Sequence, residues 1–173
     1  MSEKKLEGAG LRGQVAGKTS LSTVGKAGKG LTYRGYPIEI LSEKAKFEEV
    51  AYLLMYGALP NQNEFNEYSN KLISMRALPE SLIEVLERIP AEAHPMDVMR
   101  TGCSMLGNIE PEGDFSNQQE SADRILATMA SVIVYWYKYS HEGVKVNTET
   151  DNATIGGHFL SLLHGKKVGE DQI

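Results

Sequence analysis

The sequence contains a single cysteine, Cys103, among its 173 residues. One cysteine excludes an intramolecular disulfide and any zinc site built from cysteine ligands, and it is typical of a protein from a reducing compartment. Because Cys103 falls on the apolar side of a predicted helix, we interpret it as a small buried residue.

Long hydrophobic runs are also missing, since no apolar stretch approaches the roughly 20 residues needed to cross a bilayer. The first ten residues are charged and lack the apolar core of a secretory signal, and their acidic residues are unusual in a mitochondrial transit peptide. We therefore expect no membrane partner and a cytoplasmic location.

Basic residues are not in excess. The chain has 18 Lys and Arg against 23 Asp and Glu, which gives a net charge of −5. Nucleic-acid binding needs clustered basic residues, whereas here acids and bases alternate, so we expect no nucleic-acid partner. A hydrophobic content of 41% and a charged content of 24% are near globular averages, and the length suits about one domain with a sizeable core.

Residues 1–37 are rich in Gly, Ser and Thr and predict short extended segments joined by turns, with a hairpin loop at 25–30. Gly17-Lys18-Thr19 resembles the end of a phosphate-binding loop, but Gly13 stands at the wrong spacing, so we predict a turn. The expected strand or contact residues of this segment are Val15, Leu21, Val24, Leu31 and Tyr33.

From residue 38 onward the apolar residues recur at helical spacing, which predicts short, closely connected helices over 38–173. The first has an apolar face of Phe47, Val50, Ala51 and Leu54 and ends at Gly57. The next opens with a capping box from Asn61 to Glu64 and presents Phe65, Tyr68, Leu72 and Met75 on one face. A third begins at Pro79, carries Leu82, Ile83, Val85, Leu86 and Ile89, and stops at Pro90.

Residues 93–102 predict a fourth helix. Pro95 suits the first helical position and Asp97 the first turn, where its charge meets the positive end of the helix dipole. We interpret His94 as a capping residue at the entry and Arg100 as a surface or salt-bridge residue. Met96, Met99, Cys103 and Leu106 form the predicted apolar stripe, which Gly107 ends as a left-handed cap.

A second capping-box pattern at Ser116 to Gln119 predicts a long helix that reaches about Ser140. Residues 125–137 are apolar or small on nearly every side, so this helix should be buried all round. The neighbouring helices should cover only part of it, and a missing domain or a partner subunit would cover the rest. Full burial within this chain is the alternative.

The last predicted helix, near residues 151–163, carries Ile155, Phe159, Leu162 and Leu163 and stops at Gly165. His158 and His164 are six residues apart, which does not place them on one face, so we expect no metal site. We interpret these two histidines, and His141, as surface or helix-end residues.

Residues 10–17, 19–25, 31–37, 47–54, 94–101, 135–141 and 156–165 together resemble the amino-terminal part of the citrate synthase family. Tyr-Arg-Gly-Tyr at 33–36 and His-Pro-Met at 94–96 are characteristic of that family. Ser-Thr-Val-Gly at 22–25 and Tyr-Trp-Tyr at 135–137 indicate its 2-methylcitrate synthase branch.

This resemblance implies an all-α fold: a multi-helix large domain, incomplete here, preceded by an extended and hairpin segment over residues 1–37. It implies an acyltransferase of propionate catabolism or the tricarboxylic acid cycle, which condenses propionyl-CoA or acetyl-CoA with oxaloacetate to give 2-methylcitrate or citrate plus CoA. Acyl-CoA is then a substrate, and no cofactor is expected. It also implies a homodimer through helices near 95–107 and 117–140.

In this family the catalytic residues lie in motifs such as Glu-His-x-Phe-Asn-Ala-Ser and His-Gly-Gly-Ala-Asn-Glu. Neither motif occurs in the sequence, so we assign no catalytic, substrate-binding, cofactor-binding or metal-binding residue. We expect the chain to be the non-catalytic amino-terminal half of the enzyme, inactive alone. The choice between propionyl-CoA and acetyl-CoA stays open.

The alternative hypothesis is a free-standing, non-catalytic helical interaction module derived from such an enzyme. The polar ending and the missing catalytic motifs are compatible with it. In either case we expect the isolated chain to associate, because the helix around Met129 and Ile133 has much apolar surface to cover.

Overall fold

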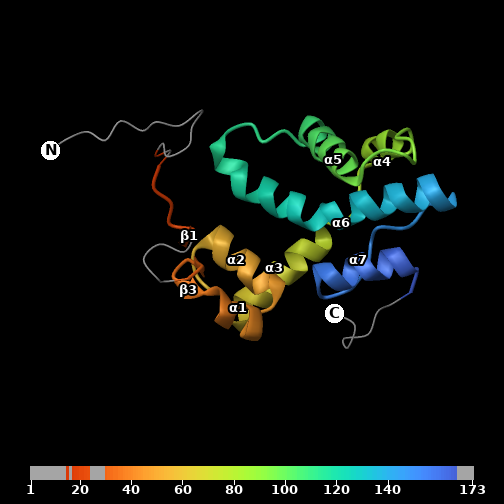
Figure 1. The fold of residues 1–173 in the computed structure, drawn as a ribbon. Helices are drawn as coiled ribbons and strands as arrows, with labels where there is room; N and C mark the ends of the chain where they lie inside the picture. Colours follow the sequence, from red (N-terminus) through yellow and green to blue (C-terminus); the bar gives the residue numbers. More distant parts are fainter. Residues whose placement is uncertain (1–14, 16, 24–29, 167–173) are drawn as a thin grey trace.

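The computed structural model describes residues 15, 17–23 and 30–166. They form a small three-stranded sheet and seven α-helices (Figure 1). The strands are β1 (Ser22–Thr23), β2 (Thr32–Tyr33) and β3 (Tyr36–Pro37). The helices are α1 (Ile38–Lys44), α2 (Phe47–Tyr56), α3 (Gln62–Ser74), α4 (Glu80–Leu86), α5 (Pro95–Ile109), α6 (Gln118–Glu142) and α7 (Ile155–His164), with a 3₁₀ turn, η2 (Phe115–Asn117), before α6. The predicted all-α class with a short extended segment is confirmed.

Helix α6 is the centre of the molecule, with α4 and α5 on one side and α7 on the other (Figure 1). Its Val132, Tyr135 and Trp136 pack into one core with apolar residues of α4 and α5. A smaller cluster joins Ala127 of α6 to Tyr68 and Leu72 of α3. The other members of the larger core are Leu78, Leu82, Leu86, Val98 and Leu106.

The prediction that the chain leaves much of α6 uncovered is wrong, and the alternative of burial within the chain is close to what is observed. Met129 and Ile133 are packed against the larger core. Of the large apolar residues of α6, only Ile125 and Tyr137 are exposed, at 36% and 39%. The physical reason is that four helices of the same chain, α3, α4, α5 and α7, pack against this helix.

The three strands are antiparallel in the order β1, β2, β3, as the extended reading of this segment predicts. Arg34 and Gly35 have positive φ angles of 48° and 92° and form the tight turn between β2 and β3. Of the predicted loop at 25–30, only Gly30 lies among the described residues, and Val24 lies outside them. Val15 is 90% exposed, so its predicted contact role is wrong.

Local capping chemistry explains where α3 and α5 begin. The Asn61 side chain accepts hydrogen bonds from the N–H groups of Asn63 and Glu64 at 2.9 and 3.1 Å, and the Glu64 carboxylate accepts the Asn61 N–H at 2.7 Å. His94 Nδ1 accepts the N–H of Met96 at 3.2 Å, directly before Pro95. Both predicted helix starts are confirmed.

The predicted end of α5 is wrong, and of its predicted apolar stripe Leu106 is buried, Met99 and Cys103 are half-buried and Met96 is exposed. The helix continues through Gly107 to Ile109, where Glu110 N–H donates to the Leu106 carbonyl at 2.8 Å. Its buried face is Val98, Gly102 and Leu106, because these positions face α6, whereas Met96 points outward. A similar error affects α2, in which Glu48 and Leu53 are buried while Phe47, on the predicted face, is 61% exposed.

Four further helix boundaries can be compared with the predictions: two are confirmed and two are wrong. Pro79 precedes α4 as its N-cap, and α4 ends at Leu86, short of Pro90, with turns in between. The second capping box is wrong: Asp114 accepts the Ser116 N–H at 2.8 Å and begins η2, and Asn117 makes no side-chain cap before α6. The predicted stop at Gly165 is confirmed by its left-handed φ of 65°.

Candidate functional site

The four histidines of the chain are the first residues to place, because imidazole is the commonest proton-transfer group in enzymes. His94 is exposed at the start of α5, and His164 is exposed at the end of α7. His141 is exposed and stacks on Tyr137. For these three the predicted surface or helix-end positions are confirmed.

His158 was predicted to be a surface or helix-end residue, and this prediction is wrong. Its side chain is 0% exposed, in the middle of α7 and facing α6. Nε2 lies 2.9 Å from Ser131 Oγ of α6, and Nδ1 lies 2.8 Å from Thr150 Oγ1 of the connection between α6 and α7. The error arose because only the tertiary packing of α7 on α6 determines which side of α7 is buried.

Arg76, which follows α3, lies in the same buried cluster and is 1% exposed. Its Nη1 donates to the carbonyls of Asn152 at 2.6 Å and Thr150 at 3.3 Å, and its Nη2 donates to the carbonyl of Thr154 at 3.2 Å. The guanidinium therefore ties the connection before α7 to the end of α3. Burial lowers the pKa of Arg76, and the negative charge of Glu48 opposes that shift.

The hydrogen bonds of this cluster fix which nitrogen of His158 carries the proton. The Ser131 hydroxyl donates to the Arg76 carbonyl at 2.9 Å, so its oxygen accepts from His158 Nε2–H. Nδ1 then accepts from the Thr150 hydroxyl. Burial, together with the nearby charge of Arg76, lowers the pKa of His158 to about 4, so the imidazole is neutral at pH 7.

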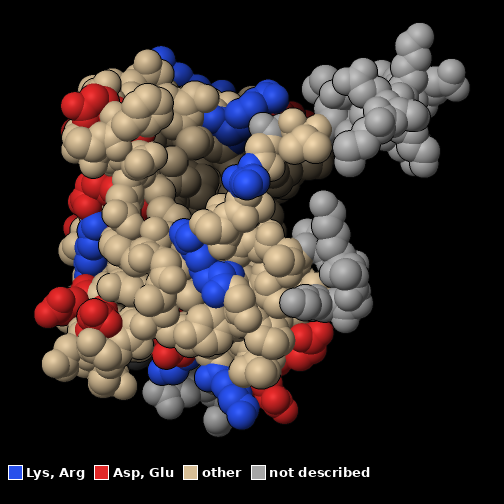
Figure 2. Space-filling model, turned by 90° about the vertical axis from the view of Figure 1, so that its left-hand side faces the viewer, with Lys and Arg blue, Asp and Glu red and all other residues tan. Residues whose placement is uncertain are grey.

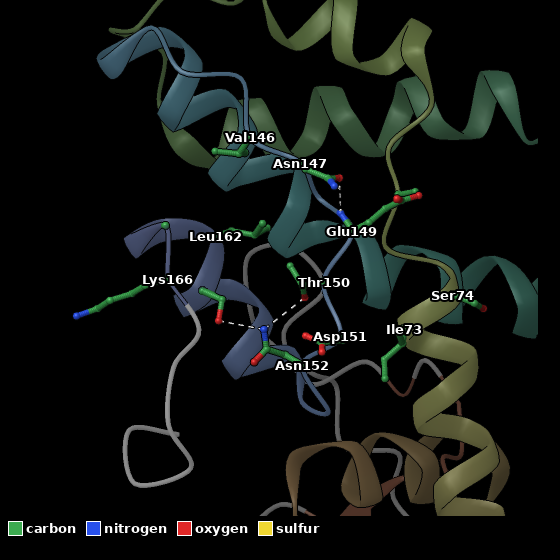
Figure 3. Close-up of a pocket in the computed structure, with 13 residues that line it drawn as sticks. Ile73, Ser74, Val146, Asn147, Glu149, Thr150, Asp151, Asn152, Leu162 and Lys166 are labelled. Atoms are coloured by element: carbon green, nitrogen blue, oxygen red, sulfur yellow. Dashed lines mark hydrogen bonds between the residues drawn. The ribbon is translucent and has the colours of Figure 1, made fainter.

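A pocket of about 810 Å³ lies above this cluster, between α3, α7 and the connection (Figure 3). Its floor is polar: Asn152 Nδ2 donates to Ser161 Oγ at 3.0 Å and is 3.4 Å from Thr150 Oγ1. Ile73, Val146 and Leu162 form apolar parts of the wall, and Glu149, Asp151 and Lys166 bring charges of both signs. This mixture is not that of a site for a dianion, which needs converging basic groups.

A second buried polar cluster surrounds Asp123 of α6, which is 0% exposed. Its carboxylate accepts hydrogen bonds from the hydroxyls of Tyr56 at 2.6 Å and Tyr68 at 3.0 Å, and from Lys71 Nζ at 2.8 Å. Burial and the Asp123 carboxylate raise the pKa of Tyr56 to about 12. Every contact joins α2 or α3 to α6, so this cluster fastens those helices together.

The described residues do not assemble the usual parts of a hydrolytic or metal centre. No group of three or more His, Cys, Asp and Glu residues within residues 30–166 and the described part before them is placed to hold a metal ion. Ser131 and His158 form a serine–histidine pair by distance, but both are fully buried and the serine proton is donated to a backbone carbonyl. The pair therefore has a structural role.

In the view of Figure 2, basic side chains lie mainly in the middle of the face and acidic ones mainly along its edges, with uncharged surface between most of them. No helix in the described part of the chain is both long enough and apolar enough to cross a bilayer. Arg100 lies on the surface and pairs with Asp97 at 3.0 Å, as predicted.

Sequence reasoning missed Arg76, Ser131 and Thr150 as partners of His158. These residues are separated by up to 82 positions, and no local pattern links them. The sequence contains one weak signal: Arg76 lies within the apolar-rich stretch 75–79. A lone arginine there must either pair with a buried acceptor or extend its side chain to solvent.

A small effect is expected for His94→Ala, because it removes the acceptor of the Met96 N–H at the start of α5. Loss of such a cap costs about 1 kcal/mol. Urea unfolding of the variant and the parent measures this difference. A loss above about 2 kcal/mol would contradict a role confined to capping.

Comparison with known proteins identifies the relatives of this fold. A family model described as the citrate synthase C-terminal domain matches residues 10–173. The 2-methylcitrate synthase of Shewanella oneidensis is 64% identical over 163 residues, which are 94% of this chain and 44% of that protein. The chain thus spans less than half the length of that relative.

Solved structures of citrate synthases have the same fold as this chain. The citrate synthase of Thermotoga maritima superimposes with a TM-score of 0.78 at 28% identity, over 92% of this chain and 42% of that one. The citrate synthase of Thermoplasma acidophilum, solved as a ternary complex with carboxymethyl coenzyme A and oxaloacetate, shares the fold with a TM-score of 0.81 at 21% identity, over 94% of this chain and 43% of that one. Since the family model covers nearly the whole chain, the protein belongs to the citrate synthase family.

Proposed function

We propose that the protein acts in an acyltransferase that condenses propionyl-CoA, and also acetyl-CoA, with oxaloacetate to give 2-methylcitrate or citrate plus CoA. The observation that carries this proposal is the 64% identity to a 2-methylcitrate synthase over 94% of the chain. Resemblance of the fold alone does not require identity at this level, since two solved citrate synthases share the fold at 28% and 21% identity.

Within that enzyme, this chain supplies scaffold and no catalytic residue. The reaction needs a carboxylate to remove a weakly acidic proton from the acyl-CoA α-carbon, a neutral imidazole to stabilise the enol oxygen, and arginines to hold the dicarboxylate. The buried histidine and arginine of this chain, His158 and Arg76, are already bonded to the chain itself and are inaccessible to a substrate. Acyl-CoA enters as a substrate, and side chains suffice without a bound cofactor.

An assay of CoA release tests the proposal on the full product of the gene. Thiol appearance is followed with oxaloacetate and either propionyl-CoA or acetyl-CoA. We expect turnover with both, and no turnover from residues 1–173 alone. Absence of turnover with either acyl-CoA overturns the proposed function. The His94→Ala variant serves as a control and should retain the parent rate.

We also propose that α5 and α6 form the interface of a homodimer. Apolar side chains that the chain itself does not cover occur along this part of the surface: Met96 is 62% exposed, Phe115 is 84% exposed, and Ile125 and Tyr137 are partly exposed. An interface over these helices would bury them.

Met96→Glu tests the interface. Met96 lies in the first turn of α5, where an acidic residue suits the helix dipole, so the fold should tolerate the change. Sedimentation is expected to show a dimer of the parent and at least a tenfold weaker dimer of the variant, since a charge at an apolar contact costs more than about 1.4 kcal/mol. Val144→Glu, an exposed apolar position after α6, is the matched control. Equal association of both variants contradicts the interface.

The burial of α6 favours a second candidate, the free-standing interaction module. Because the chain covers its own central helix, residues 30–166 contain the larger core that an independent unit needs. Reading the gene beyond codon 173 separates the two: a downstream His-Gly-Gly-Ala-Asn-Glu-like motif supports the enzyme, and an immediate stop codon supports the module.

A further inference from the structure

The latch cluster, defined as Arg76, Ser131, Thr150, Asn152 and His158, is used neither by the proposed reaction nor by the proposed interface. It is the place where three separate parts of the chain meet: the end of α3, the middle of α6, and the connection with α7. We propose that this cluster is an acid-sensitive latch, which holds α7 and its preceding connection against α6 while His158 is neutral and releases them when His158 is protonated.

The direction of the hydrogen bonds is the first step of the argument. Ser131 has one hydroxyl proton, and it is donated to the Arg76 carbonyl at 2.9 Å. The serine oxygen can therefore accept from His158 Nε2–H, at 2.9 Å, and the Thr150 hydroxyl must donate to Nδ1, at 2.8 Å. Both ring nitrogens are satisfied only when the imidazole is neutral.

Protonation of His158 is incompatible with these donor and acceptor roles. A proton on Nδ1 turns that nitrogen into a donor, so the Thr150 hydroxyl loses its acceptor in a buried site. Thr150 Oγ1 already lies 3.4 Å from Arg76 Nη1 and 3.4 Å from Asn152 Nδ2, both of which can only donate. The ring would also carry a positive charge at 0% exposure beside the guanidinium of Arg76.

The charged groups of the surrounding elements do not compensate for that charge. Arg76 is a cation. Glu48 of α2 is buried, and its Oε1 accepts the Ile155 N–H at 2.7 Å, but its negative charge acts on the guanidinium of Arg76. Glu149 and Asp151 of the connection line the pocket above the cluster, and α6 contacts the ring through the uncharged Ser131.

What the latch holds follows from its contacts. Arg76 binds the carbonyls of Thr150, Asn152 and Thr154, which lead directly into α7, and His158 binds the connection and α6 at once. When these bonds fail, the pocket between α3 and α7 loses its polar floor. The larger core of α4, α5 and α6 contains none of these residues, so it should stay closed.

The polypeptide of residues 1–173, which contains the larger core that an independent unit needs, permits a clean test because it has four histidines. A His94→Asn, His141→Gln, His164→Gln variant changes three exposed residues and leaves His158 as the sole imidazole. In ¹⁵N-histidine NMR we expect the neutral Nε2–H form and no titration from pH 8 down to about 5, where exposed histidines with a pKa near 6.5 are mostly charged. A titration near 6.5, or an Nδ1–H form, overturns the proposal.

Hydrogen exchange of the same variant tests the release. Corrected for intrinsic rates, protection in residues 148–164 is expected to fall about tenfold per pH unit from about pH 6 to pH 4, because the open form binds one more proton. Hydrogen-exchange protection in α5 should stay constant over the same pH range. Adding His158→Gln to the variant keeps a donor toward Ser131 and removes the titrating group, so the fall should disappear. If protection in residues 148–164 still falls with pH in the variant that carries His158→Gln, carboxylates cause the fall and the proposed latch is overturned.

Discussion

Gly102→Ala is expected to destabilise the protein by about 2 kcal/mol, although alanine is the better helix former. Gly102 lies within α5 and is buried against α6. A Cβ atom there would lie 2.6 Å from Cγ1 of Val132, a separation that demands movement of one helix. Val132 is 0% exposed, and its branched side chain is held by the surrounding core. Overpacking of this kind costs about 1–3 kcal/mol, which exceeds the gain of about 1 kcal/mol from helix propensity.

Gly107, one and a half turns further along α5, provides the matched control. It is exposed and helical, and an added Cβ would meet no atom within 4 Å. Gly107→Ala should therefore stabilise the protein by about 0.5–1 kcal/mol. Urea or thermal unfolding of both variants measures the contrast in sign.

Val132→Ala supplies the remaining corner of a double-mutant cycle. Alone it should destabilise the protein by leaving a cavity beside Gly102. Combined with Gly102→Ala, it gives the new methyl group its space, so the two changes together should cost less than their sum by at least about 1 kcal/mol. Additive effects would mean that the close approach of α5 and α6 at this point does not limit the substitution.

Local signals in the sequence were sufficient for most helix starts. Asn61 and Pro95 predict the beginnings of α3 and α5 correctly because capping depends on residues within one turn. Gly57 and Gly165 predict helix ends correctly for the same reason. The false capping box at Ser116 failed because Asp114, two residues earlier, competes for the same N–H group.

The buried face of a helix depends on what packs against it, and here the sequence was insufficient. In α5 the apolar residues fall on two faces, and only the position of α6 selects Val98, Gly102 and Leu106. The latch cluster is harder still, since Arg76 and His158 are joined only through contacts made across the fold. Polar residues give no periodic signal of burial, so a histidine on a short helix was assigned to the surface.

Replacing Arg76 is expected to cause the largest loss of stability of any single change considered. Its guanidinium holds three backbone carbonyls before α7, at 2.6, 3.2 and 3.3 Å. Arg76→Ala leaves these carbonyls with fewer donors in a buried site and opens a cavity. Hydrogen bonds from charged groups contribute about 1.5–3 kcal/mol each, but removal of the buried charge also relieves its desolvation cost. We therefore expect a net loss of about 3–5 kcal/mol in urea unfolding.

Arg76→Met separates the two opposing effects, since it keeps most of the volume and removes the charge. If the desolvation free energy of the buried guanidinium exceeds the stabilisation from its hydrogen bonds, the methionine variant should be as stable as the parent or more stable. We expect it to be destabilised, because methionine cannot replace the donors that Arg76 directs at the carbonyls of Asn152, at 2.6 Å, and Thr154, at 3.2 Å. Arg100→Met is the control: that side chain is 76% exposed and pairs with Asp97 on the surface, so its loss should cost less than about 0.5 kcal/mol. Equal stability of Arg76→Met and the parent would show that the connection before α7 is held by its packing and not by the arginine.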